Sequence, residues 1–202
     1  GDVDCMDGAL SGSAGKTTFT GTIDRRPCSL NTWELTALSS VEETAAGVPV
    51  GVVNLQGQAL MPPIDNPFRR ADEVLAEMRR ERPDLKVVLV DMHAEATSEK
   101  QAMGWYLDGR VTAVLGTHTH VPTADERILP RGTALQTDVG MTGPYESIIG
   151  MRPEKVLERF LYNTPRPFEP AKRGVELRGA LVDADETSGH AVAIRRIRLE
   201  GP

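Results

Sequence analysis

Apolar runs of strand length alternate with amphipathic stretches from residue 48 onward, which indicates a mainly α/β domain. Short apolar runs bounded by polar or Gly- and Pro-rich stretches predict strands of a buried sheet. The predicted strands are residues 48–55, 87–90, 111–115 and 133–137. Two longer β-like runs, 175–182 and 191–199, are separated by a turn rich in Asp, Ser and Gly. They predict a terminal hairpin that closes the core.

Helical periodicity predicts three helices between these strands, each with apolar positions on one side. The first lies between Pro67 and Pro83, and the third opens at Pro153. The second begins near Ser98, which has capping-box spacing to Gln101. The apolar positions are Ala71, Val74, Leu75 and Met78 in the first helix, Met103, Trp105 and Leu107 in the second, and Val156, Leu157, Phe160 and Leu161 in the third.

Three of the four histidines lie just past predicted core strands. His93 follows the run 87–90, and His118 and His120 follow the run 111–115. Because loops at the ends of such strands can meet at one edge of a sheet, we predict that these imidazoles converge as a metal site. Imidazole suits zinc, iron or manganese-type ions, and His118 and His120 could serve two adjacent metals. A lone histidine is more often a core or loop residue, but three at strand ends favour the metal.

Other motif-like segments do not support a different chemistry. The sequence GSAGKT at 12–17 resembles a phosphate-binding loop, but Leu10 stands where its first glycine belongs and no apolar strand precedes it. No serine lies in a Gly-x-Ser-x-Gly elbow, so nucleophilic serine catalysis is not supported. His190, in the turn of the terminal hairpin, is interpreted as a solvated surface residue outside the site.

Composition and charge exclude several classes of partner. The 202 residues fit one domain of ordinary size, and no apolar run approaches the ~18 residues of a membrane helix. A net charge of -6 lacks the basic excess of proteins that bind polymeric nucleic acid. Cys5 and Cys28 form neither a disulfide scaffold nor a zinc pattern, and no signal peptide is visible, so we expect a cytoplasmic protein. Residues 1–47 lack sustained periodicity. We therefore predict an atypical N-terminal segment at 1–47 and a domain at 48–202.

Longer motifs carry a family resemblance that spans residues 48–199. They are HAEATSEK at 93–100, GTHTHVPTAD at 116–125, TDVGMTG at 137–143, NLQG at 54–57 and NPF at 66–68. Through them the chain closely resembles the YmdB-like bacterial metallophosphoesterases, a calcineurin-like branch. The resemblance implies an α/β (α+β) fold, a two-layer β-sandwich flanked by helices, with a dinuclear iron, manganese or zinc centre. It also implies water-driven hydrolysis of small phosphodiesters, with 2′,3′-cyclic nucleotides as the candidate substrates.

The resemblance also assigns roles to residues by their place in the motifs. His93 and His118 would ligate the second metal and His120 the first. Glu95 would orient a ligand histidine by accepting its second N–H, and four residues would shape the mouth of the site. These four are Thr117, Thr119, Asp138 and Gly140. The family places further ligand motifs in its N-terminal half, and Gly1-Asp2-Val3 is the one counterpart of them in this sequence. No general acid is therefore assigned, and part of that half is expected to be missing.

Three hypotheses follow: a working phosphodiesterase with a rebuilt site, a metal-binding but inactive form, and an interaction module with structural histidines. The amount of bound metal separates the third from the others, and hydrolysis of bis-p-nitrophenyl phosphate with manganese separates the first from the second. Because the assigned ligands are few, we expect activity far below that of a complete family member. The expected partner is a small phosphoester, neither polymeric nucleic acid nor a membrane, and a homo-oligomer is a candidate assembly.

Overall fold

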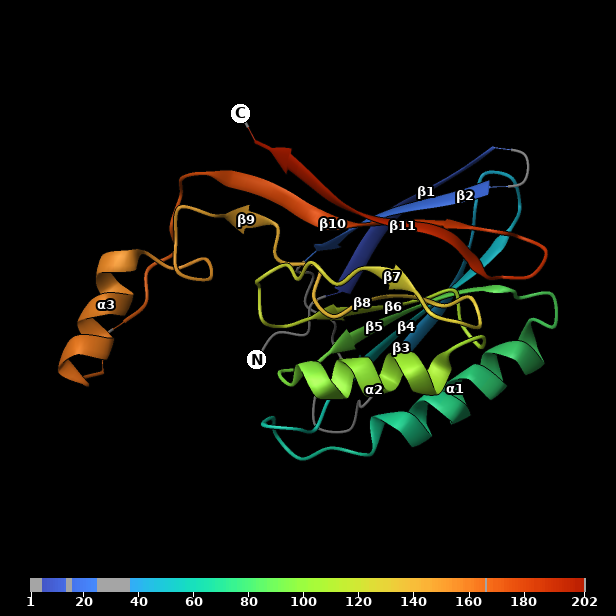
Figure 1. The fold of residues 1–202 in the computed structure, drawn as a ribbon, viewed down its shortest axis with the longest axis horizontal. Helices are drawn as coiled ribbons and strands as arrows, with labels where there is room; N and C mark the ends of the chain where they lie inside the picture. The colour runs from blue at the N-terminus through green and yellow to red at the C-terminus, as the bar shows by residue number, and fades with distance from the viewer. Residues whose placement is uncertain (1–4, 14–15, 25–36, 166, 202) are drawn as a thin grey trace.

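A six-stranded sheet with the order β3-β4-β5-β6-β8-β7 lies at the centre of the molecule (Figure 1). The computed structural model describes residues 5–13, 16–24, 37–165 and 167–201. The four inner strands run parallel, whereas β3 and β7 pair antiparallel at the two edges. The strands are β3 (Ala37–Glu43), β4 (Pro49–Gln56), β5 (Val87–His93), β6 (Ala113–Thr117), β7 (Arg127–Ile128) and β8 (Ala134–Gln136). All four predicted core strands are therefore confirmed, although the β6 pairing begins two residues later than predicted.

Helices α1 (Pro67–Glu81) and α2 (Thr97–Leu107) cover one face of this sheet (Figure 1). The apolar face predicted for the first helix is buried against the sheet, together with Met103 and Leu107 of α2. The Asn66 side chain accepts hydrogen bonds from the N–H groups of Phe68 and Arg69, and therefore caps α1. The first predicted helix is confirmed in position and in its buried face.

The start of α2 differs from the capping-box prediction. The N-cap is Ala96, no side chain caps the helix, and Ser98 lies exposed within the first turn. Packing places this helix instead, because Met103 is fully buried and a Cβ on Gly104 would meet Leu135 at 2.8 Å. Trp105, predicted among the apolar positions, is half exposed. The expected role of Ser98 as a helix cap is therefore wrong.

A second sheet packs on the other face of the central sheet and completes a sandwich. Its order is β1-β2-β10-β11, and β9 (Gly143–Pro144) pairs with β10. Strands β10 (Val175–Ala184) and β11 (Ala191–Glu200) form the predicted terminal hairpin. Between the two sheets, one apolar cluster joins side chains of both layers: Val50, Val87, Leu89, Ala113 and Ala134 with Val182, Ala184 and Ala191. The predicted two-layer sandwich flanked by helices is therefore confirmed.

The N-terminal segment contributes strands to both sheets. The hairpin of β1 (Cys5–Ser13) and β2 (Lys16–Asp24) joins β10 through the pairs Asp183↔Thr18 and Ala184↔Thr17. Strand β3 pairs along its whole length with β4. The described parts of this segment, 5–13, 16–24 and 37–47, thus extend both layers, and the proposed division at residue 47 stays a prediction.

Helix α3 (Pro153–Tyr162) opens at Pro153 as predicted but lies apart from the sandwich (Figure 1). Within its predicted apolar stripe only Val156 is buried, whereas Leu157, Phe160 and Leu161 are 51, 79 and 73% exposed. The periodicity was sufficient to predict the helix, but it did not reveal that most of the stripe faces solvent. No helix in the described ranges is long and apolar enough to cross a membrane, and cellular location stays a prediction.

Candidate functional site

Two of the three candidate histidines meet at the carboxyl edge of the central sheet. His93 ends β5 and pairs in register with Thr117, the last residue of β6, so His118 begins the neighbouring loop. His93 Nε2 lies 3.1 Å from His118 Nδ1. The two rings meet edge to face, with centroids 4.8 Å apart and an angle of 84° between their planes. Parallel pairing thus brings together residues that are 25 positions apart in the chain.

A hydrogen-bonded chain behind His93 sets the proton on its ring. The Thr117 hydroxyl donates to Asp91 Oδ1 at 2.7 Å and lies 3.0 Å from His93 Nδ1. Asn54 Nδ2 donates to the other carboxylate oxygen of Asp91 at 2.7 Å. The single hydroxyl proton of Thr117 is donated to the ionised carboxylate of Asp91. In the hydrogen bond between Thr117 and His93, the donor is therefore the N–H of His93 Nδ1. The lone pair of His93 Nε2 is therefore directed toward His118.

Asp91 has an unusual environment for a carboxyl group, because it is buried beneath the histidine pair. Loss of hydration raises the pKa of Asp91 to about 6, and the hydrogen bonds from Thr117 and Asn54 only partly oppose that rise. The sequence analysis assigned no role to Asp91 or to Asn54. The sequence did contain a signal for these two residues. In NLQG and VDMH, polar and apolar residues alternate, so that a polar side chain occurs inside a buried strand.

Glu95 lies beside His118, the second histidine of the pair. Its Oε2 atom is 3.0 Å from His118 Nε2, while His118 Nδ1 faces His93. Both ring nitrogens of His118 therefore have polar partners, and the orientation of the ring is determined from two sides. The proposed role of Glu95 in orienting a metal ligand stays a prediction.

The loop that carries His118 and His120 has a strained backbone held by a buried ion pair. His118 and His120 have φ angles of 97° and 66°, values that non-glycine residues rarely adopt. Thr119, between them, donates its N–H and its hydroxyl to Asp138 Oδ2 at 3.1 and 2.7 Å. Lys100 Nζ lies 2.8 Å from the same oxygen, and both charged side chains are at most 2% exposed. Such strain persists only where surrounding contacts enforce it, and Asp138 supplies them.

Two glycines allow the loops of the site to approach one another. Gly140 donates its N–H to Asp138 Oδ1 at 2.9 Å and has a φ angle of 85°. A Cβ at Gly116 would stand 1.8 Å from the carbonyl oxygen of Thr137, so only glycine fits there. The predicted shapers of the site mouth therefore all lie around the loop, with Thr117 behind His93, and Thr119, Asp138 and Gly140 joined by hydrogen bonds. Their contact with a substrate stays a prediction.

His120 is not joined to the other two histidines by any described contact. Its Nδ1 atom lies 3.2 Å from the carbonyl oxygen of Ile149. In the part of the chain whose side chains are described, no three His, Cys, Asp or Glu side chains are grouped so as to hold a metal ion. The structure thus brings together His93 and His118 but assembles no three-histidine centre, and the ligand roles stay predictions. Asp2 and the side chains of Cys5 and Cys28 lie outside the described residues.

His190 is exposed in the β10–β11 turn, as the sequence predicted. The turn packs near the beginning of β5, where a Cβ on Gly189 would meet the carbonyl oxygen of Lys86 at 2.2 Å. This is the end of the strand opposite to His93. His190 therefore provides a control position remote from the histidine pair.

Comparison with known proteins identifies the family. The model of YmdB-like proteins matches residues 26–197. The chain belongs to the YmdB-like family. A 2′,3′-cyclic-nucleotide 2′-phosphodiesterase of Bacillus subtilis (strain 168) is 52% identical over 155 residues, which are 77% of this chain and 58% of that protein. The chain thus spans little more than half the length of this curated relative.

Solved structures show the same fold for this YmdB-like chain. A hypothetical protein from Thermus thermophilus matches with a TM-score of 0.73 and 45% identity, over 81% of this chain and 62% of that one. A structure described as a novel phosphatase from Mycoplasma pneumoniae matches with a TM-score of 0.71 and 38% identity, over 80% and 57% of the two chains. The family and the fold expected from the sequence motifs are confirmed.

The donor atoms of this YmdB-like chain fit a metal ion in part. Two imidazole nitrogens lie 3.1 Å apart, and the contact of Thr117 with His93 Nδ1 leaves the lone pair on His93 Nε2, the nitrogen that faces His118. Imidazole nitrogens are donors that iron, manganese and zinc accept. A third donor at that position is not supplied by the described side chains. Metal ligation by His93 and His118 therefore belongs with the proposals.

Proposed function

We propose that this chain is part of a metal-dependent phosphodiesterase or phosphatase that hydrolyses small phosphoesters, with 2′,3′-cyclic nucleotides as the candidate substrates. The observation that carries the proposal is the imidazole pair of His93 and His118, 3.1 Å apart at the carboxyl edge of the sheet. The Bacillus subtilis relative, 52% identical, is a 2′,3′-cyclic-nucleotide 2′-phosphodiesterase, which favours the cyclic nucleotide as the substrate class.

Each residue near the pair has a defined part in this proposal. His93 and His118 would hold a divalent or trivalent metal ion, and His120 would follow as the ligand that the family motif implies. A bound ion of this kind supplies an activated water and stabilises negative charge that develops at phosphorus. Thr117 and Asp91 keep the His93 proton on Nδ1, and Glu95 holds the His118 ring from its other nitrogen.

A metal-binding chain without catalysis is the second candidate. It is favoured by the incomplete donor set, since a catalytic metal usually has about three protein ligands and the described side chains bring only two histidines together. Under this alternative the chain binds metal weakly and turns over no phosphodiester.

Hydrolysis with and without metal separates the candidates. We expect the purified chain, supplied with Mn²⁺, to hydrolyse bis-p-nitrophenyl phosphate and 2′,3′-cyclic AMP, and we expect excess EDTA to stop both reactions. Release of p-nitrophenol is followed by absorbance, and the nucleotide product by chromatography. Metal binding without turnover of either substrate would favour the second candidate, and turnover that is unchanged by EDTA would exclude a metal-dependent reaction.

Replacing His118 by alanine is expected to weaken metal binding at least about tenfold, because it removes a proposed ligand. The matched control is His190→Ala, which changes the same residue type at the opposite end of the sheet. Metal content per chain is measured by mass spectrometry after dialysis against graded Mn²⁺ concentrations. Equal losses in the two variants would contradict the assignment of His118.

A further inference from the structure

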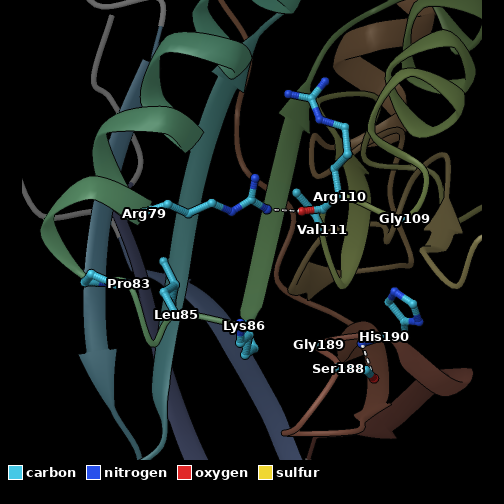
Figure 2. Close-up of a pocket in the computed structure, with 10 residues that line it drawn as sticks. All are labelled: Arg79, Pro83, Leu85, Lys86, Gly109, Arg110, Val111, Ser188, Gly189 and His190. Carbon is cyan, nitrogen blue, oxygen red and sulfur yellow. Dashed lines mark hydrogen bonds between the residues drawn. The ribbon is translucent and has the colours of Figure 1, made fainter.

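A cavity lies beside the start of β5, between the end of α1 and the β10–β11 turn (Figure 2). Its volume is about 210 Å³, and its walls come from the end of α1, the start of β5, the loop before β6 and the β10–β11 turn. Strand β5 runs from Val87, next to this cavity, to His93. At about 3.3 Å per residue, the cavity is roughly 20 Å from the histidine pair, so it is a separate site.

The cavity has a positively charged lining without a carboxylate. Among its lining residues are Arg79, Lys86, Arg110 and His190, and none is Asp or Glu. The Arg110 guanidinium is directed away from the cavity and pairs with Asp72, while its carbonyl oxygen accepts a hydrogen bond from Arg79 (Figure 2). Among the residues that the structure describes, no carboxylate forms an ion pair with Arg79 or Lys86.

Neighbouring carboxylates act on these two cations only at longer range. Asp84, the acidic residue closest in sequence to Lys86, forms its ion pair with Arg82 at 3.1 Å and interacts with Lys86 through its charge alone. Helices α1 and α2 both end near this edge, where exposed carbonyl groups would repel an anion. This repulsion is partly reduced. The carbonyl oxygens of Met78 and Leu107 accept hydrogen bonds from the backbone N–H groups of Arg82 and Arg110. The charge of Arg79 and Lys86 therefore dominates the cavity.

The wall that carries Ser188 and His190 is held rigidly against the sheet. The Thr112 hydroxyl donates to the carbonyl oxygen of Gly189 at 2.7 Å and accepts the N–H of Val88 at 3.0 Å. Gly189 has a φ angle of 77°, and its N–H donates to the carbonyl oxygen of Asp185 at 2.7 Å. Because the turn is fixed on both sides, the polar groups that Ser188, Gly189 and His190 contribute to the cavity are already in place before a ligand arrives.

We propose that this cavity binds the phosphate group of a small phosphorylated molecule. A guanidinium and an ammonium that lack carboxylate partners match the charge of a phosphate, and the arginine fork can donate to two of its oxygens. The volume is below the ~300 Å³ at which drug-sized pockets begin, so the ligand is a free phosphate or a compact phosphate monoester. This site is independent of the phosphodiesterase proposal, because none of its lining residues belongs to the histidine pair.

Calorimetric titration of the full chain tests the proposal, with inorganic phosphate in one arm and ribose 5-phosphate in the other. We expect saturable binding of at least one of them, about tenfold weaker in Arg79→Gln and in Lys86→Gln. Arg80→Gln is the matched control, since Arg80 is the next residue on α1, pairs with Glu77 and does not line the cavity. It should leave binding unchanged, as should His118→Ala.

The two arms distinguish the sources of the phosphate. Tighter binding of ribose 5-phosphate identifies a phosphate monoester, whereas equal or tighter binding of inorganic phosphate identifies the free ion. The proposal is overturned if neither ligand saturates by about 10 mM, or if Arg80→Gln weakens binding as much as Lys86→Gln does. It is also overturned if His118→Ala abolishes binding while Lys86→Gln retains it, because the ligand then occupies the histidine site.

Discussion

Replacing Lys100 by alanine is expected to lower the free energy of unfolding by about 3–5 kcal/mol. The Lys100 ammonium lies 2.8 Å from Asp138 Oδ2, and these side chains are 1 and 2% exposed. Removal of the cation leaves a carboxylate that is buried without its opposite charge, which is the costly way to break such a pair. Asp138 also anchors the strained loop through Thr119, so the same change should loosen the backbone between His118 and His120.

Urea denaturation measures the loss, and amide hydrogen exchange at Thr119 measures the loosening of the loop. Arg70→Ala is the matched control, because it breaks an ion pair with Glu73 whose two side chains are 39 and 61% exposed. An exposed pair contributes only about 0–1 kcal/mol. A loss for Lys100→Ala no larger than that of the control would show that the buried pair does not hold the loop.

Replacing Asp91 by asparagine is expected to remove a pH dependence of stability that amounts to about 2–3 kcal/mol between pH 4 and pH 7. Burial raises the pKa of Asp91 to about 6 in the folded chain, from an ordinary value of 3.8. Between these values the folded state keeps a proton that the unfolded state has lost. The contribution of Asp91 to stability is therefore largest below about pH 4, and it falls as the pH rises through about 6.

The measurement is the difference in unfolding free energy between Asp91→Asn and the unchanged chain, taken at several pH values in EDTA. This difference should increase in favour of the variant from about pH 4 to about pH 7. Asp72→Asn is the control of opposite sign, because hydrogen bonds from Tyr106 and Arg110 lower the pKa of Asp72. A difference for Asp91→Asn that stays flat with pH would contradict the raised pKa.

Local periodicity was sufficient to predict most elements of this chain. Strands β4 and β5 are short apolar runs, and the buried residues of α1 recur with the helical period. In these elements the sequence pattern itself indicates which side chains are buried. The terminal hairpin was predicted for the same reason. Placement of His93 and His118 past two strands was sufficient to predict that they meet, because parallel strands end at one edge.

The pattern of apolar and polar residues did not predict contacts between segments that are distant in the sequence. The exposed stripe of α3 has the same periodicity as a buried one, and periodicity does not identify the surface that covers it. The position of α2 follows from packing rather than from its capping sequence.

Sequence alone therefore determined the family, the main elements and the edge of the sheet that carries the histidines. Tertiary structure decided the partners of their side chains. Lys100 and Asp138 are 38 positions apart, and Asn54 and Asp91 are 37 apart, so nothing in their local surroundings indicates that they meet. The direction of His120 depends on positive φ angles in its loop, which long-range hydrogen bonds to Asp138 maintain. Periodicity reports burial, whereas a site is defined by which buried and half-buried groups face one another.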